Sequence, residues 1–373
     1  MARVAVAMSG GVDSSVAAAL MAAEGHEVVG FTMNLWPTWV PQTEEGQGCC
    51  GIGAIDDARS VARALGIRHY VLNLRETFER EVIGYFAGEY ARGRTPNPCI
   101  ACNKAIKFDL LLRKVRALGM DQLATGHYAR IDRGPDGRFR LLRAVDPHKD
   151  QSYVLTGLLQ GQLAHLRFPV GGYTKPQIRA IARRAGLCVA DKPDSQEICF
   201  VPGGNYASVV ERFEPRALRP GPVYDLRGRY LAQHQGLARY TVGQRRRLGV
   251  SGGGTPWYVA RIDADRNALI VGDAGALACP ELEAEEVNWI AVPGLSAPRP
   301  VTVRIRHASA DIPAVIAPAQ DGRIAVRFEA WPRAAAPGQA VAFYDGEVVL
   351  GGGVIADTRV GDGVDGLAVS SRA

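Results

Sequence analysis

The sequence lacks a long uninterrupted apolar run, and it lacks a charged-then-apolar leader. A membrane-spanning helix needs about 20 consecutive apolar residues, and a secretory leader needs a basic stretch followed by an apolar one. We therefore expect a cytoplasmic protein. Seven cysteines in such a chain do not indicate a structural disulfide framework, so metal-binding, redox and nucleophilic roles stay open for them.

The charge of the chain is small but unevenly placed. With 47% hydrophobic and 22% charged residues, the composition is that of an ordinary globular protein, and 373 residues predict two or three domains. The net charge is +6, yet residues 212–247 hold nine Arg against Glu214 and Asp225, a local excess of seven, so the rest of the chain nets about −1. This segment indicates a phosphate-rich partner at one surface. A solvated charged face is the alternative.

A Gly-Gly loop near the start of the chain is its most informative stretch. Residues 4–8 predict a buried strand, and residues 12–24 predict an alanine-rich helix. Between them, Gly10 and Gly11 allow a sharp turn whose N–H groups cradle an anion. The loop lacks the Lys and the glycine spacing of a Walker A motif. Gly-Gly alone also fits an ordinary strand-to-helix turn in which Asp or Ser caps the helix. The full sequence Ser-Gly-Gly-Val-Asp-Ser directly after a strand favours a phosphate site.

The next two hundred residues alternate between strand and helix patterns. Strands are predicted over residues 27–33, 69–74 and 123–128, and helices over residues 54–65 and 76–90. This alternation predicts a doubly wound parallel α/β sheet whose ligand lies at the carboxyl ends of the strands. A long Gly-rich loop that carries Cys49 and Cys50 is predicted over residues 34–53.

A Pro-Asn-Pro segment carries two of the cysteines. Two prolines in residues 93–104 predict a stiff, exposed loop, and a helix follows over residues 106–117. Cys102 is therefore predicted near a helix N-terminus, where the dipole with Lys104 and Lys107 favours the thiolate form.

The sequence allows several roles for Cys99, Cys102 and Cys199. A Cys-x-x-Cys pair such as Cys99 and Cys102 can be a redox couple or half of a zinc site. Because no second such pair follows, structural zinc ranks low. Cys199 lies between apolar residues and reads by itself as a core thiol.

The pattern changes beyond residue 202, where Gly and Pro increase and helical periodicity fades. After residue 281, period-two alternation predicts antiparallel strands. We therefore expect an N-terminal α/β domain, a small mixed or β central domain with a basic surface, a C-terminal antiparallel β-barrel and a loose tail. Their predicted bounds are residues 1–202, 203–278, 279–358 and 359–373.

The Gly-Gly loop resembles the pyrophosphatase-type loop of ATP-dependent adenylating enzymes. Lys-Asp-Gln-Ser-Tyr at 149–153 and Asp-Ser-x-x-Ile-Cys-Phe at 194–200 follow the Pro-Asn-Pro segment, and Gly-Gln-Arg at 243–245 and Gly-Gly-Gly at 351–353 come later. In this order, over nearly the whole chain, the motifs closely resemble the bacterial tRNA-specific 2-thiouridylase family.

The resemblance implies an adenine nucleotide α-hydrolase-like ATP pyrophosphatase domain over residues 1–202. ATP with Mg²⁺ adenylates the C2 oxygen of the wobble uridine at tRNA position 34, and sulfur transfer then gives 2-thiouridine, AMP and pyrophosphate. Two alternatives stay open. One is another adenylating enzyme with the same loop, such as an amide-forming ligase or a tRNA lysidine synthetase, and the other is a non-catalytic RNA-binding protein.

The resemblance also implies residue roles. Asp13, Cys102 and Cys199 are catalytic: Cys199 carries the sulfur as a persulfide, and Cys102 releases it or resolves the reaction as a Cys102–Cys199 disulfide. The implied ATP-binding residues are Ala7, Met8, Ser9, Gly10, Gly11, Val12, Asp13, Ser14, Met33 and Gly126. The implied tRNA-binding residues are Asn97, Pro98, Cys99, His127, Lys149, Asp150, Gln151, Arg306, His307 and Gln339.

One position departs from the family pattern, because many members carry Asp where this chain has Cys99. Cys99, Cys102 and Cys199 together offer three ligands for a [4Fe-4S] cluster as an alternative sulfur source. The persulfide route is favoured because the loop also works with Asp. The resemblance further implies a monomer that binds the tRNA anticodon stem-loop and a sulfur donor, such as a cysteine desulfurase or a sulfur-relay protein, and no membrane.

Overall fold

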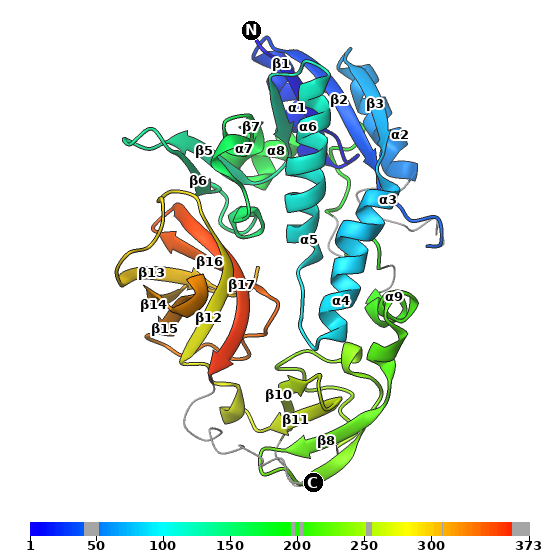
Figure 1. Ribbon diagram of the computed structural model, residues 1–373. Helices are drawn as coiled ribbons and strands as arrows, with labels where there is room; N and C mark the ends of the chain where they lie inside the picture. Colours follow the sequence, from blue (N-terminus) through cyan, green and yellow to red (C-terminus); the bar gives the residue numbers. More distant parts are fainter. Residues whose placement is uncertain (41–51, 195–197, 202–203, 251–255, 308, 360–373) are drawn as a thin grey trace.

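The computed structural model describes residues 1–40, 52–194, 198–201, 204–250, 256–307 and 309–359 (Figure 1). Most of the loop predicted over 34–53, including Cys49 and Cys50, lies outside these ranges. So do the middle of the 194–200 motif and all but one residue of the predicted tail. None of the helices in the described ranges is long and apolar enough to cross a membrane.

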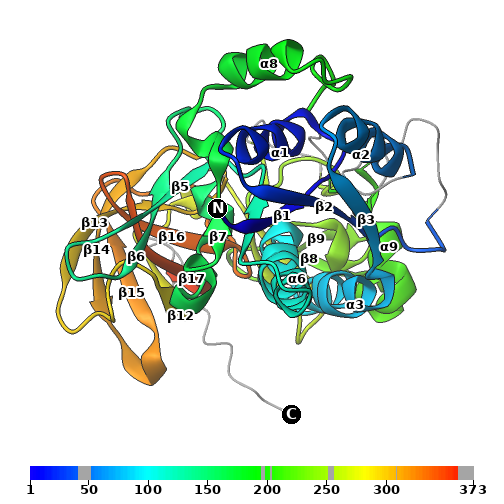
Figure 2. The ribbon, with the colours of Figure 1, turned by 90° about the horizontal axis from the view of Figure 1, so that it is seen from above.

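The N-terminal domain is built on a parallel sheet with the strand order β3-β2-β1-β4-β7. In Figure 2, helices α1, α2 and α8 lie on one side of the sheet, and α3 and α6 lie on the other. The predicted doubly wound fold is therefore confirmed. The strands are β1 (Arg3–Ala7), β2 (Glu27–Asn34), β3 (Arg68–Asn73), β4 (Gln122–Thr125) and β7 (Leu166–Arg167). Four of these helices are α1 (Val12–Ala23), α2 (Ile52–Ala64), α3 (Arg75–Phe78) and α8 (Lys175–Arg184).

Strand β1 is buried on both faces, which explains its continuous apolar sequence. Val4 and Val6 pack in the cluster under α1, whereas Ala5 packs with Phe31 on the opposite face. Chain order reverses at β1, since β2 lies on one side of it and β4 on the other. Ligands of such sheets bind at the carboxyl ends of the strands beside this switch point.

The Pro-Asn-Pro segment corrects one prediction. The helix begins at Pro98 rather than at residue 106, and it runs through α5 (Pro98–Ala101), a π-helical stretch (Cys102–Leu111) and α6 (Leu112–Ala117). Asn97 caps it, because its side chain accepts hydrogen bonds from the N–H groups of Cys99 and Ile100. Proline is tolerated at the first helical position, since that N–H has no helical partner. Cys102 therefore lies in the second turn, and the helix-terminus argument for a thiolate does not apply to it.

A second interrupted helix lies beside the first one. It consists of α3, a π-helical stretch (Glu79–Gly84) and α4 (Tyr85–Ala91). Short helices and turns complete the described parts: α7 (Gln160–Leu163), α9 (Tyr206–Phe213), and 3₁₀ turns at Ser152–Leu155, Pro169–Gly172, Pro215–Leu218, Leu237–Arg239, Gly275–Leu277 and Gln320–Gly322.

The central domain is a small mixed sheet with the order β10-β11-β8-β9. Only the pairing between β11 and β8 is parallel. Val223, Val259 and Leu269 form its core together with Tyr240. The strands are β8 (Gly221–Asp225), β9 (Tyr230–His234), β10 (Tyr258–Asp263) and β11 (Ala268–Gly272).

The C-terminal domain is an antiparallel barrel, as predicted. Its strands follow the order β12-β15-β14-β13-β16-β17, and pairing of β12 with β17 closes it. They are β12 (Glu281–Trp289), β13 (Arg299–Arg304), β14 (Ile312–Pro318), β15 (Ile324–Phe328), β16 (Ala340–Asp345) and β17 (Val348–Arg359).

A hairpin of the N-terminal domain is joined to this barrel. It consists of β5 (Ala129–Arg133) and β6 (Phe139–Arg143), and β6 pairs with β17 through Leu142 and Val348. Figure 1 shows the hairpin between the two domains. The first and last domains therefore share one continuous sheet.

Candidate active site

The Gly-Gly loop lies at the carboxyl end of β1, beside the end of β4. Gly10 has φ +69°, and a Cβ there would overlap the carbonyl oxygen of Ala54 at the start of α2. A Cβ on Gly126, after β4, would lie 2.6 Å from the amide nitrogen of Ser14. Both positions require glycine because other backbone segments approach too closely. The predicted nucleotide residues of β1, α1 and β4 thus meet at one edge of the sheet.

Hydrogen bonds within the loop hold its shape. The Ser9 amide donates to Ser14 Oγ at 3.1 Å, and Ser15 Oγ donates to the Gly11 carbonyl at 2.8 Å. Among the described residues, no side chain caps the start of α1. The N–H groups of this first turn are therefore available to an anion.

Asp13 contacts two groups from distant parts of the chain. Lys175 Nζ lies 2.8 and 2.9 Å from its two carboxylate oxygens, and the Tyr128 hydroxyl donates to Oδ1 at 2.7 Å. Lys175 is 8% exposed. Burial, followed by the neighbouring Asp13 carboxylate, raises the pKa of Tyr128, so its hydroxyl remains a donor. Asp13 and Lys175 therefore form a largely buried ion pair beside the loop.

A second carboxylate, Asp194, extends this charged cluster. It lies 2.6 Å from Lys175 Nζ, 2.7 Å from Lys149 Nζ and 3.8 Å from Arg179. Burial alone would raise the pKa of Asp194, but hydrogen bonds from Lys149 and Lys175 outweigh it, and the pKa is lowered. The cluster thus gathers positive charge near the loop.

Lys192 reaches the loop itself. Its Nζ donates to the Gly10 carbonyl at 3.2 Å and lies 2.5 Å from Asp57 of α2. Sequence analysis did not single out Lys175, Arg179 or Lys192 as site residues. The available signals were a proline directly after Lys175 and after Lys192, and the basic helix that contains Lys175 and Arg179.

Two of the predicted thiols belong to one hydrophobic cluster. Cys102 is 8% exposed and lies in the cluster that also contains Phe200. Cys199 lies in a turn, is half-buried and packs against the same cluster. Cys99 lies one helical turn before Cys102 and is exposed. The fold therefore gathers Cys102 and Cys199 from separate segments into one region.

The described part of the structure gives no support to the iron–sulfur expectation. Among the residues that the structure describes, no three His, Cys, Asp or Glu side chains are grouped to hold a metal ion. Cys99, Cys102 and Cys199 all belong to the described residues. The described residues likewise hold no group of three such side chains that could serve as a protein site for Mg²⁺.

His127 lies where β4 ends. Its Nδ1 is 2.7 Å from Thr125 Oγ1, and its ring packs against Phe108 and Phe168. Burial, with a smaller effect of Lys107, lowers the pKa of His127 well below its usual value. The imidazole is therefore neutral at pH 7. Met33, at the end of β2, packs where two hydrophobic clusters meet.

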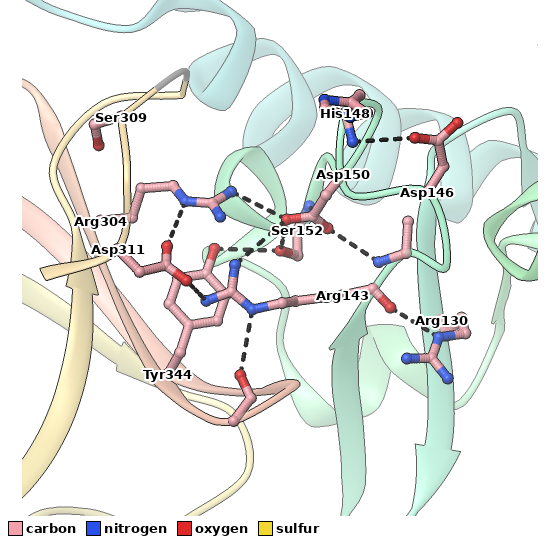
Figure 3. A network of polar contacts seen from close by, with 12 residues as sticks. Arg130, Arg143, Asp146, His148, Asp150, Ser152, Arg304, Ser309, Asp311 and Tyr344 are labelled. Carbon is pink, nitrogen blue, oxygen red and sulfur yellow. Dashed lines mark hydrogen bonds and ion pairs between the residues drawn. The ribbon is translucent and has the colours of Figure 1, made fainter. Parts of the chain in front are cut away.

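Asp150 is the centre of a polar network between domains (Figure 3). Its side chain is 3% exposed and accepts hydrogen bonds from the Ala144 amide at 3.0 Å and Ser152 Oγ at 2.9 Å. Arg304 of β13 donates to the same carboxylate at 3.1 Å, and Arg143 of β6 lies 3.8 Å away. Asp150 therefore joins the N-terminal domain to the barrel.

Other predicted tRNA contacts also have protein partners. Gln151 Oε1 accepts from the Tyr128 amide at 2.9 Å, and Pro98 is buried at the helix start. In the barrel, Arg306 and His307 are exposed, and the His307 ring lies 6.2 Å from that of Tyr153. Gln339 is half-buried. The structure thus brings the residues at 149–153 and 306–307 to one interdomain face.

The barrel also contacts the segment before the thiol-bearing helix. The Thr95 amide donates to the Pro337 carbonyl at 2.8 Å, and a Cβ on Gly338 would lie 2.8 Å from the Thr95 nitrogen. Gln339 is therefore one residue away from a contact with the Pro-Asn-Pro segment.

A hollow of about 550 Å³ lies at the opposite edge of the sheet. Ala2, Gln122 and His165 are among the residues that line it. These residues mark the amino ends of β1, β4 and β7, whereas the glycine loop follows the carboxyl end of β1. The hollow is therefore separate from the nucleotide edge.

Comparison with family models first defines the class of each domain. A model described as "tRNA methyl transferase HUP domain" matches residues 2–203, one described as "tRNA methyl transferase PRC-barrel domain" matches residues 209–273, and one described as "Aminomethyltransferase beta-barrel domain" matches residues 280–355. The chain thus combines a HUP domain with a PRC-barrel and a C-terminal β-barrel.

Curated relatives define the family more narrowly. The tRNA-specific 2-thiouridylase MnmA of Heliobacterium modesticaldum is 50% identical over 355 residues, which cover 94% of this chain and 92% of the relative. The enzyme of the same name from Acetivibrio thermocellus is 48% identical over 356 residues, or 95% and 99% of the two chains. The chain belongs to the tRNA-specific 2-thiouridylase family. Among solved structures, a 4-thiouridine synthetase–RNA complex with bound ATP aligns over 57% of this chain and 50% of that chain, with 17% identity and a TM-score of 0.35.

Proposed function

We propose that this protein is a tRNA-uridine 2-sulfurtransferase that uses ATP to thiolate C2 of the wobble uridine. One observation carries the proposal. This chain, which is about half identical to a curated relative over nearly its whole length, has a glycine loop shaped for an anion and two thiols at one hydrophobic cluster. The family models at 2–203, 209–273 and 280–355 support the proposed division into domains at residues 202 and 278.

The loop and its cations suit the first half of the reaction. The phosphates of ATP would lie against the N–H groups of Gly10 to Ser14, and Lys175 and Lys192 would supply positive charge near them. Met33 and Gly126 would border the adenosine. The uridine C2 oxygen attacks the α-phosphorus, pyrophosphate leaves, and the oxygen becomes part of an AMP leaving group. Mg²⁺ bound to the phosphates would neutralise their charge.

The thiols suit the second half. In the persulfide route, the terminal sulfur on Cys199 attacks C2 and AMP departs. Cys102 then attacks the sulfur of Cys199, which forms the Cys102–Cys199 disulfide and releases 2-thiouridine. A thiol reductant restores both cysteines. Alternatively, Cys102 releases sulfide from Cys199 before the attack on C2. No step is assigned to an iron–sulfur cluster, because no ligand group for one is present among the described residues.

The remaining partners follow from this chemistry. Asn97, Pro98 and Cys99 are proposed to contact the target base. The other tRNA contacts are proposed at His127, residues 149–151, Arg306, His307 and Gln339, with the anticodon stem-loop as their ligand. A cysteine desulfurase or a sulfur-relay protein is proposed to load Cys199. We propose that the protein acts as a monomer in the cytoplasm, where its tRNA substrate occurs.

The test is mass spectrometry of tRNA nucleosides after incubation with ATP, Mg²⁺, a thiol reductant for turnover, and a cysteine desulfurase with cysteine as the source of persulfide-level sulfur. We expect 2-thiouridine from the wild type, and loss of this product in Cys102→Ser and Cys199→Ser. Cys188→Ser is the matched control, since this exposed cysteine lies outside the thiol cluster. A ligase or lysidine synthetase would form no 2-thiouridine even as the wild type, and its own product would not depend on Cys102 or Cys199. A methylated nucleoside, or no tRNA-dependent ATP/pyrophosphate exchange, would contradict the proposal.

A further inference from the structure

Trp331 is an exposed tryptophan at the junction of the barrel and the central domain. It lies in the turn between β15 and β16, and its residue is 59% exposed. The other tryptophans in the described part of the chain are buried or half-buried. Covering the exposed part of so large an apolar ring with another surface would be favourable.

The turn that carries Trp331 is held on both sides. Before it, the Phe328 amide donates to the Pro280 carbonyl at 2.9 Å, and the Glu329 amide donates to Pro313 at 3.0 Å. After it, the Pro332 carbonyl accepts from the Cys279 amide at 3.0 Å. The indole is thus displayed on a fixed backbone, so little conformational entropy is lost when a ligand packs on it.

Two arginines lie near the backbone that carries this ring. Arg333 is exposed two residues further on, and the Arg306 guanidinium donates to the carbonyl of Arg333 at 3.0 Å and to that of Ala334. Gly243 of the central domain touches Ala334, because a Cβ on Gly243 would overlap the Ala334 methyl group. We call this junction, formed by Gly243, Arg306, Trp331, Arg333 and Ala334, the Trp331 patch.

The central domain adds more positive charge beside the patch. Arg245, Arg246 and Arg247 follow Gly243 after one intervening residue, and all three are exposed. An exposed aromatic ring among arginines matches the chemistry of single-stranded RNA, because the ring stacks on a base while guanidinium groups contact phosphates. A protein partner would need a matching acidic surface, whereas RNA supplies negative charge at every nucleotide.

The patch is connected to the proposed target-base segment. The turn from Pro332 continues to Pro337, whose carbonyl accepts from Thr95 just before the Pro-Asn-Pro sequence. A nucleotide stacked on Trp331 would therefore lie on the same connection that contacts the Pro-Asn-Pro segment, but away from the residues proposed to contact the target base.

We propose that Trp331 stacks on an unpaired nucleotide of the RNA substrate other than the target uridine, and that Arg306 and Arg333 hold its backbone. This inference rests on the proposed function, since it takes tRNA as the ligand. It adds a stacking contact that the sequence motifs did not indicate.

The test compares tRNA affinity of the wild type, Trp331→Ala and Trp331→Phe. Loss of one stacked base predicts weaker tRNA binding by about 5- to 100-fold for the alanine variant. Phenylalanine keeps a ring and recovers most of the affinity, and kcat at saturating tRNA stays near the wild-type value. Tryptophan fluorescence falls when tRNA binds the wild type, and the fall is smaller in Trp331→Ala. Tyr70→Ala is the control, because this exposed aromatic residue lies on β3 in the N-terminal sheet.

Two results would overturn the inference. One is equal tRNA affinity of Trp331→Ala and the wild type. The other is unchanged tRNA affinity with weakened binding of a purified cysteine desulfurase, which would assign the patch to a protein partner. Either result can occur while the wild type still thiolates tRNA. Absence of 2-thiouridine from the wild-type reaction would instead contradict the proposed function. The two failures are therefore distinguishable.

Discussion

Arg94 Nη2 donates a 2.7 Å hydrogen bond to Glu285 Oε1, which joins the segment before the thiol-bearing helix to strand β12 of the barrel. The same guanidinium donates through Nε to Glu89 Oε2 of α4, also at 2.7 Å. Arg94 is thus a three-way connection between α4, the Pro-Asn-Pro segment and the barrel. The neighbouring contact of Thr95 with Pro337 fixes the same place. The barrel therefore sets the position of the segment that carries Asn97.

Arg94→Ala is expected to lower both stability and turnover. The substitution removes charge-assisted hydrogen bonds from Glu89, which is largely buried, so we expect a loss of about 2 kcal/mol in the free energy of unfolding. Because the segment is then less well placed, kcat should fall more than tRNA affinity. Urea unfolding and steady-state kinetics measure the two effects. Arg113→Ala is the control, since its ion pair with Asp109 is exposed and worth at most about 0.5 kcal/mol. A variant as active and as stable as this control would refute the positioning role.

Asp13→Ala is expected to abolish adenylation while it leaves tRNA affinity largely unchanged. The carboxylate holds Lys175 and the Tyr128 hydroxyl beside the Gly-Gly loop. Without it, we expect a fall of at least about 100-fold in ATP/pyrophosphate exchange. Asp56→Ala is the control, because Asp56 forms an exposed pair with Arg59 within α2. Strong loss of tRNA binding in Asp13→Ala would contradict the assignment of Asp13 to the ATP site.

Asp150→Ala is expected to destabilise the fold in the absence of tRNA. The substitution leaves Arg304, which is 13% exposed, with one fewer carboxylate partner, and it removes the acceptor of the Ala144 amide. Breaking such a buried network costs about 3 kcal/mol. Thermal unfolding of the free protein measures the loss. Asp132→Ala is the control, since its partner Arg140 lies with it in the partly exposed β5–β6 hairpin. Unchanged stability of the free protein would contradict this structural role of Asp150.

The lowered pKa of Asp194 predicts a stability that depends on pH. Since the folded state has the lower pKa, ionised Asp194 stabilises the fold above its ordinary pKa of about 3.9, and this contribution is lost as the pH falls through the folded value. Asp194→Asn should therefore be less stable than the wild type near neutrality, and the difference should stay constant down to about pH 5 and shrink on acidification below about pH 4. Urea unfolding across this range measures it. A difference that stays constant with pH would show that the ion pairs of Asp194 do not contribute.

Local patterns predicted much of the fold. The apolar run of β1, the small residues of α1 and Gly10 at positive φ act within one short stretch, so the glycine loop was visible in the sequence. The period-two pattern after residue 281 likewise predicted the barrel. These features depend on neighbours along the chain, which a sequence displays directly.

Long-range features were missed for the opposite reason. Lys175 lies far from Asp13 in the chain, and nothing around it indicates a buried ion pair. The start of the thiol-bearing helix was misplaced because Pro98 was read as a helix breaker, whereas capping by Asn97 makes it a helix starter. The pairing of Leu142 with Val348 likewise depends on how two domains meet.

The shared sheet of the hairpin and the barrel has a consequence for biosynthesis. A ribosome releases β6 long before β17, so the nascent chain carries an unpaired strand edge while the central domain and most of the barrel are made. Until Val348 reaches Leu142, that edge is open to wrong partners, and a chain cut short before the barrel keeps it open for good. Maturation of the first domain thus waits for the last strand to be translated.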